Sequence, residues 1–209
     1  MNPNKFFSML KAWKKLPAYR MEPRIDAMVA YYFPELFRDA LKIEVSAVIP
    51  ELPLRLGTIY PTCKNQPNRS FKVDFFVLGK DGQNFLVEMK SDSGSISVKQ
   101  CDYLKKTREI GMKALIGGIC QITAVSSFTK KYKELKSNLK RIGLINDNFE
   151  YIGKRDDVTI LFIQPGVKNP CGDSSIKVID FQKVATVIEK YYQDDFSLEL
   201  AESLREWSD

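Results

Sequence analysis

The sequence predicts an α/β domain in which helices flank a mixed central sheet. Three observations carry this prediction. Residues 23–42 repeat apolar side chains at helical spacing, and residues 71–90 alternate in two runs around a glycine-containing turn. Residues 158–163 form a near-continuous apolar run, which is typical of a strand buried in the centre of a sheet. We expect residues 23–209 to form a single domain that follows a basic segment, residues 1–22.

The N-terminal segment, residues 1–22, predicts an amphipathic helix. Phe6, Leu10 and Trp13 recur on one side, and lysines cover the remainder. We expect this helix to dock on the rest of the chain. Contact with phosphate groups or acidic lipid is the alternative.

Prolines mark the next helix and strand. Pro23 is a natural helix start, and Pro34 should break the apolar run of residues 23–42 into two helices or kink it. Residues 43–56 alternate apolar side chains but contain two prolines, which favours an edge strand or an irregular strand. The segment that follows, residues 58–70, has the composition of a loop.

The second half of the chain supplies more helices and two strands. A helix is expected to begin near Ile96 with Ser93 or Ser95 as its cap, whereas residues 114–125 fit either a strand or a helix. The other expected elements are a basic helix at 128–142 ended by Gly143, strands at 158–163 and 176–179, and acidic C-terminal helices at 181–192 and 196–207.

The chain contains no histidine, which excludes several mechanisms. Ser-His-Asp and Cys-His catalysis, zinc sites of the usual histidine type and a histidine general base all need an imidazole. Any catalysis would then depend on carboxylates, lysine, metal-bound water or a hydroxyl nucleophile.

Cysteine placement and hydropathy indicate the compartment. The cysteines at positions 63, 101, 120 and 171 form no C-x-x-C pair, so we expect free thiols in a reducing environment. No apolar run approaches the ~20 residues that span a bilayer. We therefore expect a cytoplasmic protein that does not cross a membrane.

Charge is distributed unevenly along the chain. The formal net charge is +6 and the pI is about 9.0, which favours a polyanionic partner such as nucleic acid. Between Lys99 and Arg141, basic residues far outnumber acidic ones, whereas the C-terminal helices are acidic and should face away from nucleic acid. The alternative is that the lysines merely solvate helix faces.

The expected hairpin gathers charged residues on one face. Burial of the odd-numbered apolar residues of both strands forces the even-numbered residues to the opposite face. If Leu78 pairs with Asn84, Asp74 lies directly across from Glu88, with Cβ atoms roughly 5 Å apart. Lys90 follows Glu88 on the same face.

Two opposed carboxylates need a positive charge between them. Lys90 supplies one. A divalent cation held by Asp74 and Glu88 would supply a stronger one, because Mg²⁺ prefers carboxylate oxygens and waters. The alternative is a solvent-facing hairpin with Lys72–Asp74 and Glu88–Lys90 ion pairs.

The pair of segments Val73-Asp74 and Glu88-Met89-Lys90 resembles the motifs of the PD-(D/E)XK nuclease superfamily. The proline that gives the first motif its name is replaced by Val73, while the acidic and lysine positions are kept. The resemblance implies a restriction endonuclease-like fold, with an α-β-β-β-α-β core around the mixed central sheet.

Accessory site residues also follow from this resemblance. Gln100 falls in the first turns of the next helix, where several branches of the superfamily carry a glutamine facing the site. In the branch that pairs this glutamine with a tyrosine four residues later, the match fails, because Tyr103 is only three residues later. Glu51 or Glu35 would be a further acidic ligand, and Glu51 is favoured because it is nearer the hairpin in sequence.

The resemblance implies a magnesium-dependent nuclease, with Mn²⁺ as an alternative ion and DNA as the expected substrate; RNA stays open. Asp74, Glu88 and the backbone carbonyl of Met89 would hold the metal, Lys90 would orient the attacking water, and Gln100 would position water or backbone. Many relatives act as dimers, so a homodimer is also implied. The alternatives are a catalytically inactive nuclease-fold module that binds nucleic acid or a protein, and an interaction protein with a fortuitous hairpin.

Overall fold

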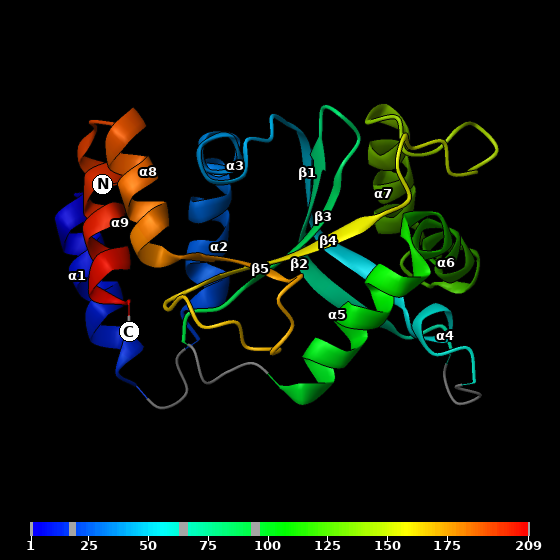
Figure 1. Cartoon of the computed structure of the whole chain (residues 1–209), viewed down its shortest axis with the longest axis horizontal. Coiled ribbons are helices and arrows are strands. Elements are labelled where there is room, and N and C mark those ends of the chain that lie inside the picture. Colours follow the sequence, from blue (N-terminus) through cyan, green and yellow to red (C-terminus); the bar gives the residue numbers. More distant parts are fainter. Residues whose placement is uncertain (1, 17–19, 63–66, 93–96, 209) are drawn as a thin grey trace. The chain divides into compact units, whose positions relative to one another are not determined.

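The protein is an α/β structure with a five-stranded mixed sheet flanked by helices, in the strand order β1-β2-β3-β4-β5 (Figure 1). The computed structural model describes residues 2–16, 20–62, 67–92 and 97–208. The strands are β1 (Val45–Arg55), β2 (Ser70–Gly79), β3 (Asn84–Met89), β4 (Val158–Gln164) and β5 (Lys177–Asp180). The helices are α1 (Pro3–Lys14), α2 (Glu22–Tyr31), α3 (Phe33–Leu41), α4 (Leu56–Ile59), α5 (Val98–Ile110), α6 (Met112–Val125), α7 (Thr129–Arg141), α8 (Phe181–Tyr191) and α9 (Asp195–Glu206). The predicted α/β class and mixed sheet are confirmed.

The chain divides into two compact units. Unit 1 comprises Met1–Val45, Glu88–Ser97 and Leu161–Asp209, and unit 2 comprises Ser46–Val87 and Val98–Ile160. The boundary at residue 22 drawn from the sequence stays a prediction.

Unit 1 is built largely from helices, and its first three helices pack with its last two. α1 packs on α9, α9 on α8, α8 on α3 and α3 on α2 (Figure 1). Phe7 and Leu10 of α1 are buried, and the Phe7 ring lies 5.3 Å from that of Phe196. The prediction of an apolar face at Phe6, Leu10 and Trp13 is therefore confirmed at Leu10. Phe7 is buried in place of Phe6, and Trp13 is 42% exposed.

Opposite charges join the first and last helices of unit 1. Lys11 of α1 forms an ion pair with Glu206 at 2.9 Å, and the Asn4 side chain donates to Glu199 at 3.1 Å. The N-terminal helix thus docks on the acidic C-terminal helix, as the docking prediction required.

The helical run near the N-terminus breaks at a proline, as expected. α2 ends at Tyr31 and α3 begins at Phe33, one residue before Pro34, with Tyr32 between the two helices. Pro34 occupies the first turn of α3, where its missing N–H costs no helical hydrogen bond.

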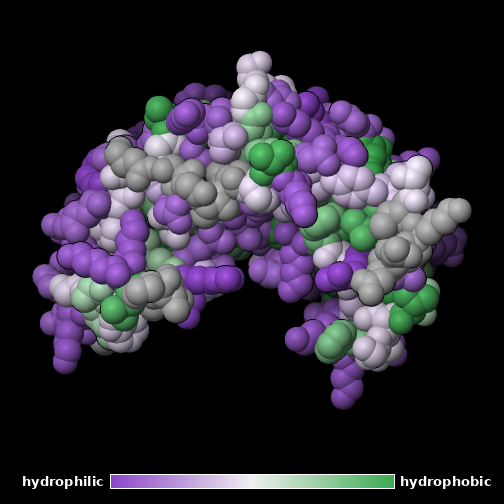
Figure 2. Space-filling view, turned by 90° about the horizontal axis from the view of Figure 1, so that it is seen from below, coloured by the Kyte–Doolittle hydropathy of each residue, from purple (hydrophilic) through white to green (hydrophobic). Residues whose placement is uncertain are grey.

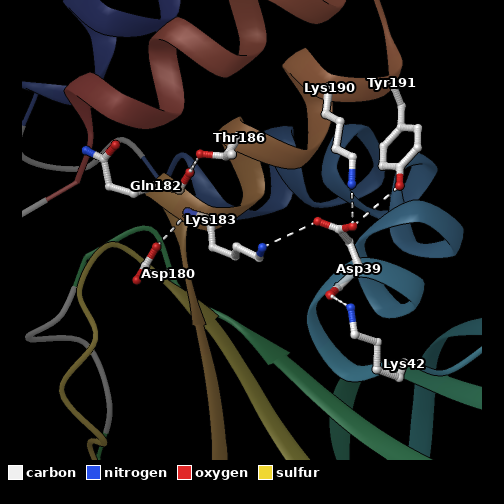
Figure 3. Close-up of polar contacts among 8 residues, drawn as sticks. All are labelled: Asp39, Lys42, Asp180, Gln182, Lys183, Thr186, Lys190 and Tyr191. Atoms are coloured by element: carbon white, nitrogen blue, oxygen red, sulfur yellow. Dashed lines mark hydrogen bonds and ion pairs between the residues drawn. The ribbon is translucent and has the colours of Figure 1, made fainter.

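A single carboxylate, Asp39 of α3, ties α3 to α8 (Figure 3). It accepts hydrogen bonds from Lys190 at 2.8 Å and from Lys183 and Tyr191 at 3.4 Å. The two ammonium groups hold the pKa of Asp39 at about 2, with the hydrogen bond from Lys190 as the largest cause.

In unit 2, the β2–β3 hairpin has the register predicted from the alternation. Leu78 pairs with Asn84, and the antiparallel ladder continues to Phe75 and Val87. The turn closes with Gly82, whose φ of 90° suits glycine.

The hairpin is buried on both faces. The odd-numbered Val77 and Val87 are buried as predicted, but so are the even-numbered Phe76 and Leu86. The alternative of a solvent-facing hairpin is wrong, because β2 and β3 lie in the interior of the strand order. The edge position of the proline-containing β1 and the short edge strand β5 are confirmed.

The helices of unit 2 decide between strand and helix for residues 114–125, and they place a short helix at the start of the expected loop. Residues 114–125, which fit a strand or a helix, belong to α6, and the basic helix is α7, which is followed by Gly143 at a φ of 75°. The expected loop at 58–70 overlaps the short helix α4 at its start. The predicted caps Ser93 and Ser95 lie outside the described residues.

The cysteines correct one expectation. Cys101 and Cys171 each take part in a disulfide bond, whereas Cys120 is a free thiol. Spacing along the chain does not determine whether a cysteine is paired, because folding decides which Cα atoms come within disulfide reach. Burial raises the pKa of the Cys120 thiol. Cys63 lies outside the described residues.

Hydrophobic residues are not gathered into a membrane-spanning helix. Within the parts of the chain that the structure describes, no helix combines the length and apolar character needed to cross a bilayer. The face drawn in Figure 2 is mainly hydrophilic, with hydrophobic residues in small separate groups.

Candidate functional site

Lys90, directly after β3, is the centre of a small charged cluster in unit 1. Its backbone N–H donates to the carbonyl of Ile163 in β4 at 2.9 Å, which fixes where the side chain starts. Its ammonium donates to Glu88 Oε1 at 2.7 Å and to the carbonyl of Met89 at 2.9 Å. Glu22, in the first turn of α2, lies 3.6 Å away through its Oε1.

This cluster is withdrawn from water. The side chains of Lys90 and Glu88 are only 6% and 3% exposed, and that of Glu22 is 29% exposed. Burial of charge is costly unless opposite charges and hydrogen bonds compensate. The Lys90 ammonium lies near two carboxylates here, which offsets part of the cost of burying its charge.

The oxygen atoms of this cluster fit a cation. Glu88 Oε1 and the Met89 carbonyl both lie within 3 Å of one positive centre, the Lys90 nitrogen. Carboxylate and carbonyl oxygens are also the protein ligands that divalent cations such as Mg²⁺ take. Among the described residues, no group of three or more Asp, Glu, Cys or His side chains gathers in a metal-binding arrangement. A metal at this position would therefore depend on waters, substrate oxygens or a carboxylate from elsewhere for its other ligands.

Three of the sequence-predicted site residues belong to unit 2. Asp74 precedes Phe75 on β2 and is half-buried, and Gln100 is half-buried in the first turn of α5. Glu51 is exposed on β1, where it forms an ion pair with Lys72 at 2.9 Å and adopts a φ of 53°.

Glu35 and Tyr103 are engaged by other groups. Glu35 on α3 accepts a hydrogen bond from Tyr192 at 3.0 Å. Burial, followed by this carboxylate, raises the pKa of Tyr192 to about 12. The Tyr103 ring stacks on Phe71 with 4.5 Å between ring centroids and 9° between planes, which is a packing role.

Glu22 is the one member of the charged cluster that sequence reasoning missed. An acidic residue just before a proline at a helix start is the ordinary preference of helix N-termini, so the sequence carried no functional signal there. Its approach to Lys90 depends on how α2 packs.

Unit 2 carries the basic surface expected from the sequence. α7 contains Lys130, Lys131, Lys133, Lys136, Lys140 and Arg141 against Glu134. Such a helix face attracts the phosphates of nucleic acid.

Comparison of the chain with protein-family models, curated proteins and solved structures gives no match. Function has to be inferred from the residues of the chain itself.

Proposed function

We propose that the protein is a metal-dependent nuclease of the PD-(D/E)XK type that hydrolyses phosphodiester bonds, with DNA as the substrate. The observation that carries this proposal is the buried arrangement of Glu88, Met89 and Lys90 at the end of a central strand. It combines, within one short segment, a carboxylate and a carbonyl suited to a divalent cation and a lysine suited to an anionic phosphate.

The order of elements supports the restriction endonuclease-like fold. α3, β1, β2, β3, α5 and β4 follow one another in the α-β-β-β-α-β order that the resemblance implies. The short α4, the helices α6 and α7 and the strand β5 would be additions to this core.

The proposal requires Asp74 as the second acidic residue. In an uninterrupted ladder, the pair after Phe75 and Val87 would be Asp74 and Glu88. The two carboxylates would then share the face that also bears Lys90.

Each residue has a distinct role in the proposed hydrolysis. Asp74, Glu88 and the Met89 carbonyl would hold Mg²⁺ or Mn²⁺. The bound ion would polarise the phosphate and lower the pKa of a water molecule. The Lys90 ammonium stabilises negative charge on the phosphate and orients the attacking water, and Gln100 contributes a further hydrogen bond to water. None of these roles needs histidine, which the chain lacks.

One observation favours a second candidate, a nucleic-acid-binding module without hydrolysis. The Lys90 ammonium already engages Glu88 and Met89, the two groups assigned to the metal. In a module that only binds nucleic acid, the Lys90 ammonium would take the place of a metal cation beside Glu88 and Met89.

Metal-dependent cleavage tests both candidates. Supercoiled plasmid, single-stranded circular DNA and branched DNA are incubated with the wild type and with Asp74→Asn and Lys90→Met in Mg²⁺ or Mn²⁺. We expect each substitution to lower the cleavage rate by about 10²- to 10⁴-fold, the range typical of a lost catalytic group. Asp81→Asn, an exposed turn residue paired with Arg155, is the matched control and should cleave like the wild type.

A second readout separates loss of catalysis from loss of fold. Mn²⁺ should raise the melting temperature of the wild type and not that of Asp74→Asn, because only a bound ligand stabilises the native state. Equal cleavage by all variants would mean a contaminating nuclease and would end the catalytic claim. DNA binding without cleavage in either metal would favour the binding module.

A further inference from the structure

A hollow of about 440 Å³ lies on unit 2, where the start of β2 meets the segment between α6 and α7. Its volume falls within the roughly 300–1,000 Å³ typical of ligand pockets. The residues that line it are Asn68, Arg69, Ser70, Ile122, Val125, Ser126, Ser127, Phe128 and Tyr132.

Aromatic and apolar side chains on this hollow are unusually exposed. Phe128 is 66% exposed and Val125 is 62% exposed, while Tyr132 is half-buried and Ile122 is buried. Exposed aromatic rings beside a hollow mark a binding surface more often than isolated surface residues do. A flat, apolar ligand group would cover them.

Hydrogen bonds fix the part of the hollow formed by Asn68 and Arg69. The carbonyl of Arg69 accepts from the N–H of Leu56 at 2.7 Å, and the Asn68 side chain accepts from Arg55 at 3.0 Å. The backbone from which the exposed Arg69 side chain extends is therefore anchored.

Positive charge follows the hollow along the chain. Lys130, Lys131 and Lys133 are exposed in the first turns of α7, which begins directly after Phe128. The first turn of α7 contains no acidic residue, and the helix begins without a side-chain cap. A ligand with negative charges on either side of a flat ring system complements this surface.

We propose that this hollow holds an unstacked base of single-stranded nucleic acid, with Phe128 and Tyr132 against the base and Arg69 and the first lysines of α7 against the flanking phosphates. Aromatic rings in a basic groove bind single strands in this way, because every base has a π-face and every nucleotide a phosphate. Duplex DNA fits less well, because its bases are already stacked on one another. The inference rests on the proposed function, which states that the bound strand is hydrolysed. It deepens that function by naming the single-stranded form in which the substrate is held.

Fluorescence anisotropy with labelled oligothymidylate, oligouridylate and a blunt DNA duplex tests this inference. Titrations use the full chain in EDTA, so binding is measured without hydrolysis. Phe128→Ala should weaken single-strand binding by about 5- to 150-fold, the range for loss of one base–aromatic stack. Phe128→Trp should keep the affinity, and its added indole should change emission when the strand binds. The two oligonucleotides tell whether DNA or RNA is the preferred source of the base.

The matched control is Tyr31→Ala, which removes an aromatic side chain of similar exposure, 68% against 66% for Phe128, from unit 1. It should bind like the wild type, and thermal melts should show all three variants folded because the substituted side chains are exposed. Tighter binding of the duplex than of both oligonucleotides, or wild-type affinity in Phe128→Ala, would overturn the inference. Because no metal is present, failure of the cleavage assay leaves this outcome unaffected, and the reverse also holds.

Discussion

At the scale of single residues, Lys90 carries most of the functional information. It is buried with Glu88 and in contact with Glu22, and removal of one partner from such a pair typically costs about 3–5 kcal/mol. Apolar residues of similar size often stabilise a core as well or better. The proposed nuclease function would give the charge of Lys90 a use beyond stability.

Asp39 gives the clearest prediction at this scale. Its pKa is about 2 in the folded protein, lowered first by the hydrogen bond from Lys190, and about 3.9 in an unfolded chain. The stabilisation is therefore fully present above about pH 4 and is lost as the pH falls towards 2. We expect Asp39→Asn to flatten the acid side of the stability profile.

Urea unfolding at a series of pH values between 5 and 2 measures this effect. The wild-type midpoint should fall more steeply than that of Asp39→Asn over this window. Asp195→Asn, an exposed acidic residue in the first turn of α9, is the control and should keep the wild-type slope in the same window. Identical slopes for the wild type and Asp39→Asn would show that the α3–α8 ion pairs do not contribute.

At the scale of elements, the hairpin turn determines whether β2 and β3 pair in the required register. Gly82 has a φ of 90°, and a Cβ added there would lie 2.7 Å from the Cβ of Lys154. Neither the backbone angle nor the neighbouring atom can adjust easily. The turn, and with it the register at Leu78 and Asn84, depends on glycine at this position.

We expect Gly82→Ala to lower the free energy of unfolding by about 1 kcal/mol or more, because alanine is strained at positive φ. Gly117→Ala is the matched control. Gly117 lies inside α6, and an added Cβ would have no heavy atom within 4 Å, so alanine should stabilise the helix by up to about 1 kcal/mol. Urea unfolding of both variants should give changes of opposite sign; a stabilised Gly82→Ala would contradict the strain argument.

At the scale of the whole molecule, charge separates between the two units. Unit 2 contains 18 Lys and Arg against 10 Asp and Glu, whereas unit 1 contains 14 against 16. The net charge of +6 is therefore the sum of a strongly basic unit and a slightly acidic one. Nucleic acid should be bound by unit 2.

The salt dependence of binding tests this separation. Each phosphate contact on a single strand contributes roughly 0.7 to the slope of log affinity against log salt concentration. Lys130→Gln combined with Lys131→Gln should reduce the slope by about 1.4, measured by anisotropy with oligothymidylate. Lys5→Gln combined with Lys15→Gln in unit 1 should leave the slope unaltered. An equal reduction of the slope by these two substitutions would mean that net charge, and not its location on unit 2, determines binding.

The sequence by itself determined most of the elements and the local geometry of the hairpin and of the α2–α3 break. Alternation predicted the register of Leu78 with Asn84, and Pro34 predicted the break between α2 and α3. These features could be predicted because they depend on neighbouring residues: side chains alternate along a strand, and proline lacks an N–H. The association of Glu88, Met89 and Lys90 belongs to the same class, since the three are adjacent in the chain.

Only the tertiary structure decided which surfaces are covered and which distant groups meet. It buried the even-numbered face of the hairpin, brought Glu22 to Lys90 and placed Phe128 beside Arg69 at one hollow. The apolar pattern of 114–125 was compatible with a strand or a helix, and packing against α4, α5 and α7 selected the helix. Burial and long-range contacts depend on how elements pack, and a one-dimensional pattern specifies a face without specifying what covers it.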